Sequence, residues 1–429
     1  MGLAYFAMSQ DLQRQANTVA VLRTLSAGGP ASVTDLRGSV GLSRPTLDAI
    51  IADLLDAGLI RRQDPRRGGG AGIDPATISG PVAGSGSGPW TSSGPVVADR
   101  GEATARQKGA GRPARSFMIN PDAAFVAGID VGRHKILVMI ADLAGAIRVS
   151  RRAEVPAEIA GAGLLELVRR TVISAAAEIR IGVDHLRAIA VGVPGVVDAA
   201  GRIARSVVVP QWSGFDIRPL LADWSGVEVT VANDANLAVL AEQWRGAARL
   251  CRDVIYILAG RRTRAAIMIN SEVLTGRHGE AGEIGSVPEL FFDTPEVLLG
   301  DPAADSAQVE AVFASALAGD RDSRIRVERF CAELARSIRF LVTVLDPEIV
   351  VVGGGLSGAG KQIIDGLHDQ LDPTDSAARQ PAILVASELG DTAVALGGIR
   401  RAQLIAAADP LINAVISGQR QPDNQRLSV

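Results

Sequence analysis

The stretch FVAGIDVGRHKILVMIAD, residues 125–142, sets the fold of most of the chain. Two apolar runs, FVAGIDV and ILVMIAD, flank a short polar turn, and IRVSRRAEV (147–155) follows as a third strand. Runs this short and this apolar are typical of buried strands. A helical stripe then follows, with Leu164, Val168, Val172 and Ala175 on one side. The pattern predicts a three-strand meander that continues into alternating helices and strands.

The same order recurs after residue 252. Strands are predicted in DVIYILA (253–259) and RAAIMIN (264–270), followed by a long helix, strand EIVVVGGG (348–355), a further helix and strand AILVAS (382–387). Strands AIAVGVPG (188–195) and EVTVAND (228–234) complete the first half. Two halves of one design predict two α/β lobes, here placed at 122–245 and 246–410, with a cleft between them as a natural ligand site.

The N-terminal region, residues 10–120, has a different character. Three short helices are predicted within 10–62, and the third, RPTLDAIIADLLD, has Ser43 as its N-cap and apolar residues on one stripe only. Short strands, LIRR (59–62) and the one within GRPARSFMIN (111–120), follow. This order is typical of a winged helix-turn-helix, whose third helix enters the DNA major groove, although a small helical bundle has the same spacing.

Charge supports the nucleic-acid interpretation. Residues 1–118 hold thirteen Arg and Lys against nine Asp and Glu, a net +4, although the whole chain carries −3. The expected DNA contacts come from the third helix and from the wing. They are Ser43, Arg44, Thr46, Asp48, Ala49, Arg61, Arg62 and Arg112.

Two segments have compositions unlike the rest. Residues 64–110 are dense in Gly, Ser and Pro and lack periodicity, so we expect a disordered insert within the wing. Residues 411–429 are expected to form a tail. No apolar run approaches the ~20 residues that a membrane helix needs. Together with two isolated cysteines, Cys251 and Cys331, this favours a cytoplasmic protein.

Five stretches in order then identify a resemblance: GIDVGRHK (128–135), GVPGVVDAAGRI (192–203), VANDANLAVLAE (231–242), GRHGEAGEIGS (276–286) and VVGGGLS (351–357). Residues 14–400 resemble the repressor, open reading frame, kinase (ROK) family of sugar kinases and sugar-responsive repressors. The resemblance implies an actin-like, ribonuclease-H-like two-lobed ATPase fold. In the repressors of this family an N-terminal winged helix precedes that body.

The resemblance also implies a sugar site. In the kinases, the Asp of the NDAN motif is the general base and the preceding Asn holds a neighbouring hydroxyl; Asn233 and Asp234 match them. Glu283 matches a sugar-binding Glu, and Ser286 stands where relatives have a His that also ligates zinc. The zinc-binding cysteines are missing, so we expect no metal and no cofactor. Asp234 also suits a plain helix N-terminus, so a purely structural role stays open.

The phosphate loops depart from the kinase pattern. Asp130 and Gly132 remain in the first loop, but Arg133 and His134 replace small residues. The second loop reads GRRTRAA (260–266), which keeps Gly260 and replaces small residues by Arg261, Arg262 and Arg264. Phosphate needs close backbone approach, so both loops are interpreted as degenerate and the arginines as a solvated edge. Gly353–Gly355 fit either a nucleotide contact or a tight turn.

These observations predict a transcriptional regulator of the repressor type rather than an enzyme. It would bind a double-stranded operator as a homodimer or homotetramer, and its degenerate kinase body would bind a sugar or sugar derivative. Two alternatives stay open. One is a working sugar kinase with an extra domain; the other is a DNA-binding protein whose body only dimerises.

Overall fold

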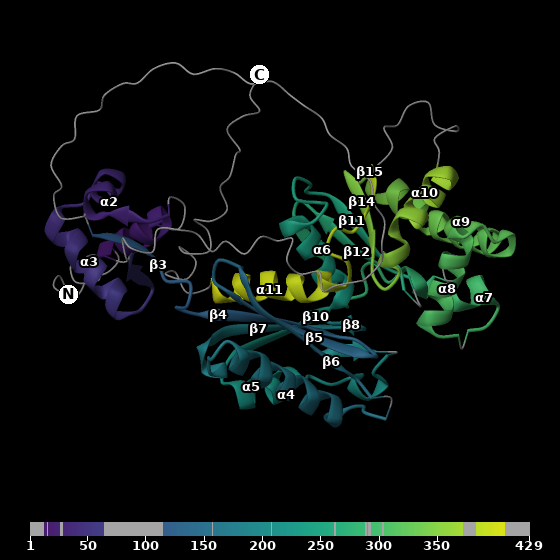
Figure 1. Cartoon of the computed structure of the whole chain (residues 1–429), viewed down its shortest axis with the longest axis horizontal. Helices are drawn as coiled ribbons and strands as arrows, with labels where there is room; N and C mark the ends of the chain where they lie inside the picture. The colour runs from purple at the N-terminus through teal and green to yellow at the C-terminus, as the bar shows by residue number, and fades with distance from the viewer. Residues whose placement is uncertain are drawn as a thin grey trace, which may run out of the picture. The chain divides into compact units, whose positions relative to one another are not determined.

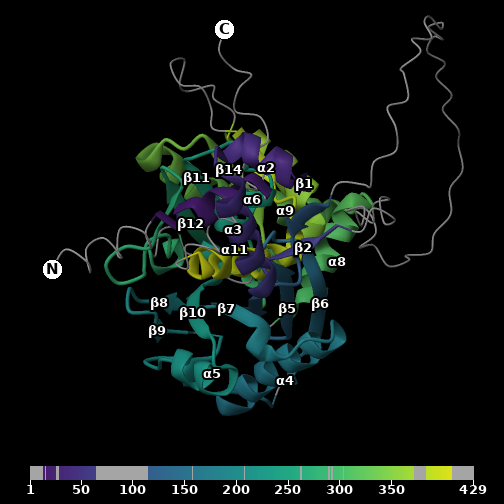
Figure 2. The ribbon, with the colours of Figure 1, turned by 90° about the vertical axis from the view of Figure 1, so that its left-hand side faces the viewer.

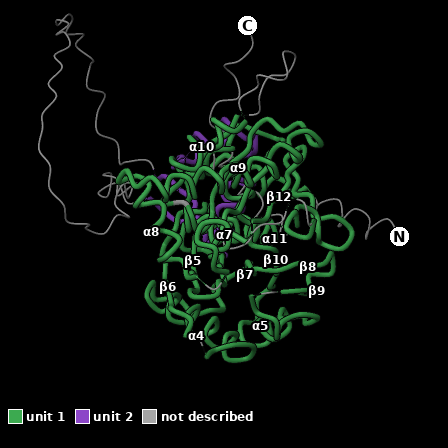
Figure 3. The backbone as a smooth tube through the Cα atoms, turned by 90° about the vertical axis from the view of Figure 1, so that its right-hand side faces the viewer, with its two compact units in different colours: residues 1–27, 121–429 green, residues 28–120 purple. Residues whose placement is uncertain are grey.

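The computed structural model describes residues 13–14, 16–25, 29–63, 115–156, 158–206, 208–260, 263–287, 290, 293–302, 304–371 and 383–407. The insert 64–110, the tail 411–429, Arg112 and Arg261 lie outside these ranges or fall in their gaps. The chain divides into two compact units, coloured separately in Figure 3. We call residues 28–120 the winged-helix unit and residues 1–27 with 121–429 the body. The helical segment 16–25 groups with the body.

Within the winged-helix unit, the second and third predicted helices and the two predicted strands follow in the predicted order, whereas the first predicted helix groups with the body and strand β1 (Ala31–Ser32) was not predicted. The other elements of the unit are α2 (Val33–Val40), α3 (Arg44–Asp56), β2 (Ile60–Arg62) and β3 (Ser116–Ile119). Ser43 caps α3 by accepting a hydrogen bond from the backbone N–H of Thr46, and Pro45 lies in the first turn. Strand β3 pairs antiparallel with both β1 and β2. The two strands that flank the insert are therefore partners, as the sequence predicts for a wing.

The first half of the body begins at residue 125. Its elements are β4 (Phe125–Val131), β5 (Lys135–Asp142), β6 (Ile147–Glu154), α4 (Ala162–Glu178), β7 (Leu186–Val193), β8 (Val196–Val197), β9 (Ile203–Arg205), α5 (Arg218–Ser225), β10 (Glu228–Asn233) and α6 (Asp234–Arg245). The large sheet has the order β10-β7-β4-β5-β6, with β4, β5 and β6 antiparallel and β7 and β10 parallel to β4.

The second half repeats that plan. It contains β11 (Val254–Leu258), β12 (Arg264–Ile269), β13 (Glu272–Leu274), α7 (Thr294–Leu299), α8 (Ser306–Leu317), α9 (Arg321–Leu345), β14 (Ile349–Gly353), α10 (Gly360–Leu371), β15 (Ile383–Ala386) and α11 (Ala393–Ala406). The sheet order β13-β12-β11-β14-β15 again combines a meander with two parallel strands. The predicted two-lobed α/β architecture is confirmed.

Two helices lie between the sheets and connect the halves. Helix α11 packs on β4 and β7 of the first sheet, on the face opposite α4 and α5 (Figures 1 and 2). Helix α6 packs against β11 and β12 of the second sheet and against α11. The first sheet is thus covered on both faces, which explains why β4 and β5 are apolar almost throughout. Asp234, the first residue of α6, is thereby brought beside β12.

The described part of the chain contains no helix that is both long and apolar enough to cross a membrane.

Candidate functional site

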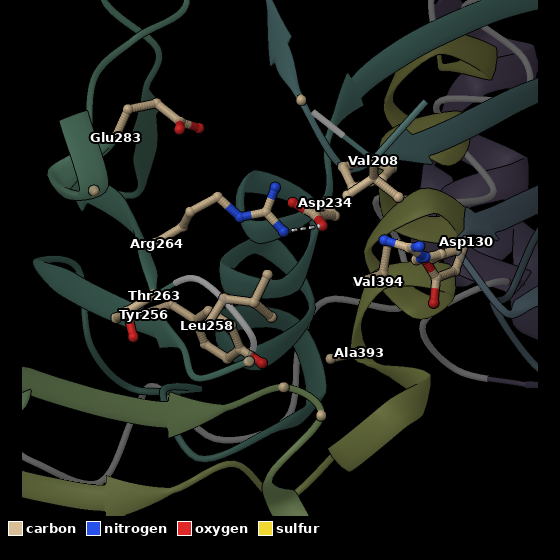
Figure 4. Close-up of a pocket in the computed structure, with 18 of the residues that line it drawn as sticks. Asp130, Val208, Asp234, Tyr256, Leu258, Thr263, Arg264, Glu283, Ala393 and Val394 are labelled. Carbon is tan, nitrogen blue, oxygen red and sulfur yellow. Dashed lines mark hydrogen bonds and ion pairs between the residues drawn. The ribbon is translucent and has the colours of Figure 1, made fainter. Parts of the chain in front are cut away.

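A cavity of about 550 Å³ lies within the body, at the ends of the central strands (Figure 4). The loop after β4, the N-terminus of α6, the β11–β12 region and the segment 283–286 all contribute to its lining. The residues that line it include Asp130, Gly132, Asp234, Gly260, Glu283 and Ser286. Residues from these four separate stretches of the sequence therefore meet in one site.

Asn233 ends β10 and caps α6. Its side-chain oxygen accepts a hydrogen bond from the N–H of Asn236 at 3.1 Å. Its amide nitrogen donates to the carbonyl of Gly195 at 2.9 Å and to Oε1 of Glu283 at 3.4 Å. The structure thus brings together Asn233 and Glu283, which are fifty residues apart in the sequence. Asn233 holds the Glu283 carboxylate in place while serving as a helix cap.

Asp234 is almost fully enclosed, at 7% relative exposure. One carboxylate oxygen accepts a hydrogen bond from the backbone N–H of Ala235 at 2.8 Å, and the other forms an ion pair with Nη2 of Arg264, also at 2.8 Å. Burial raises the pKa of the Asp234 carboxyl, although the Arg264 charge opposes the rise. Burial likewise raises the pKa of Glu283. The carboxylate that matches the general base is therefore held by a cation from the chain itself.

The sequence-based prediction that Arg264 belongs to a solvated edge is wrong. The Arg264 side chain is only 19% exposed, and it crosses the cavity from β12 towards Asp234 (Figure 4). The physical reason is that α6 packs on β12, so the first residue of that strand faces the first residue of the helix. Residues 261 and 262 lie outside the described ranges.

The glycines at the positions of the kinase phosphate loops have different structural roles. The N–H of Gly132 donates to the carbonyl of Lys135 within the β4–β5 turn, so this donor already has an acceptor within the chain. Gly354 has a φ of +100°, and a Cβ there would lie 2.6 Å from the carbonyl oxygen of Ala259. Gly354 therefore meets the requirement of a tight turn. Gly260 and Gly355 have open space where a side chain would project.

Ser286, which stands where relatives have a sugar-binding His, uses its hydroxyl within its own loop. Its hydroxyl donates a hydrogen bond to the backbone carbonyl of Glu283 at 2.7 Å, which closes the short helix η5 (Ile284–Ser286). The side chain lies at the exposed edge of the cavity. Ser286 therefore shapes the loop that presents Glu283.

A second set of charges lies near the first phosphate turn. Asp391, in the short helix η7 (Gly390–Thr392), accepts from Lys135 Nζ at 3.1 Å and from Arg152 Nη2 at 2.6 Å. Burial alone would raise the pKa of Asp391, but these two hydrogen bonds lower it overall. Lys135 is therefore already paired with a carboxylate of the body.

Asp130 should make the stability of the body depend on pH. Burial, with the nearby charge of Asp234, raises the pKa of Asp130 from 3.8 to about 7. The folded state then holds this proton more tightly than the unfolded state. Its contribution is complete below pH 3.8 and is lost as the pH rises through about 7.

Chemical denaturation of the full chain at several pH values tests this expectation. Between these two pH values, the wild type should lose about 1 kcal/mol of unfolding free energy per pH unit relative to Asp130→Asn. Asp305→Asn, at the N-cap of α8, is the control and should follow the wild type. Parallel profiles for the wild type and Asp130→Asn would refute the assignment.

Of the DNA-binding residues predicted in the winged-helix unit, those that the structure describes lie on α3, on its N-cap or on β2; Arg112 lies outside the described residues. Ser43, Arg44, Thr46, Asp48 and Ala49 are exposed at the N-terminal half of α3, while Leu47, Ile50, Ile51 and Leu54 are buried. Arg61 and Arg62 are exposed on β2. Arg44 and Asp48 approach to 3.7 Å, an exposed contact one helical turn apart. The apolar stripe thus leaves the opposite face of α3 free, as predicted.

Comparisons with known proteins match two families to different parts of the chain. The ROK family model matches residues 126–295 and 299–404, and the MarR family model matches residues 16–67. Among curated proteins, a xylose repressor of Caldicellulosiruptor bescii is 22% identical over 326 residues, which span 68% of this chain and 82% of the repressor. A glucokinase of Thermotoga maritima is 27% identical over 218 residues, 43% of this chain and 68% of the kinase.

Among solved structures, a ROK family transcriptional regulator described as a homolog of the Escherichia coli MLC protein covers 94% of this chain and 99% of its own. Its TM-score is 0.62 and its sequence identity is 18%, a level that supports the shared fold alone. The match extends over almost the whole chain and therefore includes both units.

Proposed function

The chain belongs to the ROK family, and we propose that it is a DNA-binding transcriptional regulator of the repressor type whose kinase-like body binds a carbohydrate without phosphorylating it. The ion pair between Arg264 and Asp234 is the observation that carries the catalytic part of this proposal. The joining of a winged helix to a ROK body in one chain carries the regulatory part.

The ion pair bears on catalysis in two ways. A general base must accept a proton from the substrate hydroxyl. Burial raises the pKa of Asp234 overall, but the charge of Arg264 opposes that rise and its hydrogen bond occupies one carboxylate oxygen, so the paired carboxylate is a weaker acceptor than the buried carboxylate would be alone. Arg264 also stands where the kinase loop has a small residue, so its side chain fills space that phosphate would need. The position of Arg264 therefore supports a body that does not hold an ATP phosphate chain here.

Turnover is the direct test of this part. The full chain would be incubated with ATP, magnesium and a panel of sugars, and ADP release would be measured. We expect no release above the sugar-free background. Sugar-dependent ADP formation would identify a working kinase and refute the catalytic part of the proposal.

On the DNA side, α3 supplies the proposed recognition surface. Its N-terminal half presents Ser43, Arg44 and Thr46, with Asp48 and Ala49 on the same exposed face. Arg61 and Arg62 on β2, with Arg112, would add phosphate contacts from the wing. We further propose that the regulator acts in the cytoplasm and that it forms a homodimer or homotetramer. Light scattering on the purified chain would establish the number of subunits.

Arg44→Ala should weaken DNA binding by about 1–3 kcal/mol, measured by fluorescence anisotropy. A guanidinium at this end of the helix can reach a guanine edge or a phosphate. Loss of a base contact would also relax preference at one position, whereas loss of a phosphate contact would weaken all sequences equally.

The matched control is Arg321→Ala. Arg321 is also the exposed first residue of a helix that follows a capping residue, but that helix is α9 of the body. This variant should bind DNA like the wild type. Equal affinities for Arg44→Ala and Arg321→Ala would remove Arg44 from the interface.

A further inference from the structure

We propose that the first half of the body holds a second ligand site, which takes a small carboxylic acid with an apolar body. The site is a cavity of about 330 Å³, a volume within the range of small-molecule sites. Three segments of the first half line it: the β4–β5 turn, the chain from the end of β6 into α4, and residues 208–211.

This cavity is distinct from the larger one described above. The two adjoin and share Gly132, Arg133 and Val208 in their linings. Neither Asp234 nor Glu283 lines the smaller cavity, and no element of the second half contributes to it among the described residues. The inference therefore does not depend on whether the body binds a carbohydrate.

Hydrogen bonds within the chain hold the three segments together. The N–H of Val155 donates to the carbonyl of His134 at 2.9 Å, which ties the segment after β6 to the β4–β5 turn. The indole Nε1 of Trp212 donates to the carbonyl of Gly161 at 3.1 Å, which ties the end of residues 208–211 to the start of α4. The cavity is thus preformed, so a ligand can bind with little reordering of the protein.

The walls of this cavity are mainly apolar. Val155, Leu164 and Val209 line it and are buried members of the core of the first half. Ile159 also lines it and packs against the same core. A hydroxyl-rich ligand would leave polar groups without partners against these walls, whereas an aromatic or branched aliphatic group is stabilised by leaving water. The walls therefore favour a ligand with an apolar body.

The long polar side chains of the lining can all donate hydrogen bonds. Arg133 and His134 are exposed on the β4–β5 turn, and Gln211 is exposed on the third segment. Within the described part of the chain, Arg133 and His134 use their side chains in no hydrogen bond or ion pair. A guanidinium matches the two oxygens of a carboxylate, and a neutral imidazole still has one N–H to donate. The turn can therefore hold a carboxylate at the edge of the apolar walls.

The charge of the lining also favours an acid. Arg133 meets no acidic side chain in the lining, in contrast to Arg264 of the larger cavity, which is paired with Asp234. The acids that flank the lining segment in the sequence, Glu154 and Glu158, are exposed and lie outside the lining. A bound carboxylate would thus form the ion pair that the described residues leave unmade.

The test is titration of the full chain with benzoate, phenylacetate and isovalerate, followed by ligand-observed NMR. The amides of the three acids lack the charge, and acetate lacks the apolar body. We expect at least one of the three acids to bind, with its amide and acetate at least about tenfold weaker. Failure of all three acids to bind, or an amide that binds as tightly as its acid, would overturn the inference.

Two variants locate the site. Ala160→Trp should weaken the bound acid about tenfold or more, because Ala160 lines only the smaller cavity and is exposed, so the fold has room for a larger side chain that fills the cavity. Arg133→Gln should also weaken it about tenfold, because the amide lacks the charge.

The matched control is Arg187→Gln, an exposed arginine on β7 outside both cavities, which should stay within about twofold of the wild type. Unchanged affinity in Ala160→Trp would place the acid elsewhere and overturn the assignment. Equal affinities for Arg133→Gln and Arg187→Gln would likewise overturn the ion pair with the ligand.

Discussion

Gly397→Ala is expected to lower the unfolding free energy of the body by about 3 kcal/mol or more, or to prevent folding altogether. A Cβ at this position of α11 would lie 1.8 Å from the carbonyl oxygen of Leu237 in α6. Backbone atoms at that distance cannot be relieved by a rotamer change. On the other side of α11, a Cβ on Gly128 of β4 would lie 2.0 Å from the carbonyl oxygen of Ala395.

These two contacts set the distance between the halves of the body. Helix α11 lies directly on β4 on one side and on α6 on the other, with glycine at each crossing. Separating α11 from α6 would also move Asp234 away from Arg264, because Asp234 begins α6. The same substitution is therefore expected to disturb the cavity as well as stability.

Thermal and chemical unfolding of the full chain would measure this effect. Gly358→Ala is the control, because a Cβ there meets nothing within 4 Å. The control should unfold within about 0.5 kcal/mol of the wild type. A Gly397→Ala protein as stable as the control would show that α11 and α6 can separate at little cost.

Asp234→Asn is expected to reduce effector affinity by about 30- to 100-fold while effector-free DNA binding is unchanged. Hydrogen bonds to a charged acceptor contribute about 1.5–3 kcal/mol, and the amide keeps the shape but loses the charge. The change also leaves Arg264 without its ion-pair partner, so the guanidinium would lose its orientation. Both effects act on the same ligand.

Calorimetry with the uncharged sugar that the wild type binds is the measurement, followed by anisotropy with DNA. Asp322→Asn is the matched control, because Asp322 is also an acid in the first turn of a helix but is exposed on α9. Sugar affinity that is indifferent to Asp234→Asn would place the effector elsewhere and leave the body as a scaffold.

Local sequence patterns predicted a large part of this structure. The N-cap at Ser43 and the one-sided stripe of α3 depend on neighbouring residues, whose periodicity can be read directly. The pairing of β2 with β3 joins residues far apart in the sequence, and it was predicted because these two strands flank the insert. The repeated meanders likewise predicted the two sheets. The resemblance to a family, rather than spacing, supplied Asn233, Asp234 and Glu283 as candidates, and the structure places all three within the body.

The role of Arg264 could not be predicted in this way. An arginine at the start of a hairpin strand is usually solvated, and its direction depends on which element covers that strand. Here α6 covers β12, although α6 comes earlier in the chain and follows a strand of the other sheet. One signal in the sequence could have revealed the pair of Arg264 and Asp234. An arginine stands in the phosphate loop, and the aspartate expected in the same cleft has no other cation among the described residues to balance its charge.

Selection of bound DNA from a random pool by the full chain tests the central proposal most directly. A winged-helix regulator that binds as a symmetric oligomer should enrich one motif in two related half-sites, with a spacing set by the protein. The Arg44→Ala protein, processed in parallel, should recover that motif less efficiently. Recovery of unrelated sequences by the wild type, with no motif enriched over the starting pool, would contradict a sequence-specific transcriptional regulator.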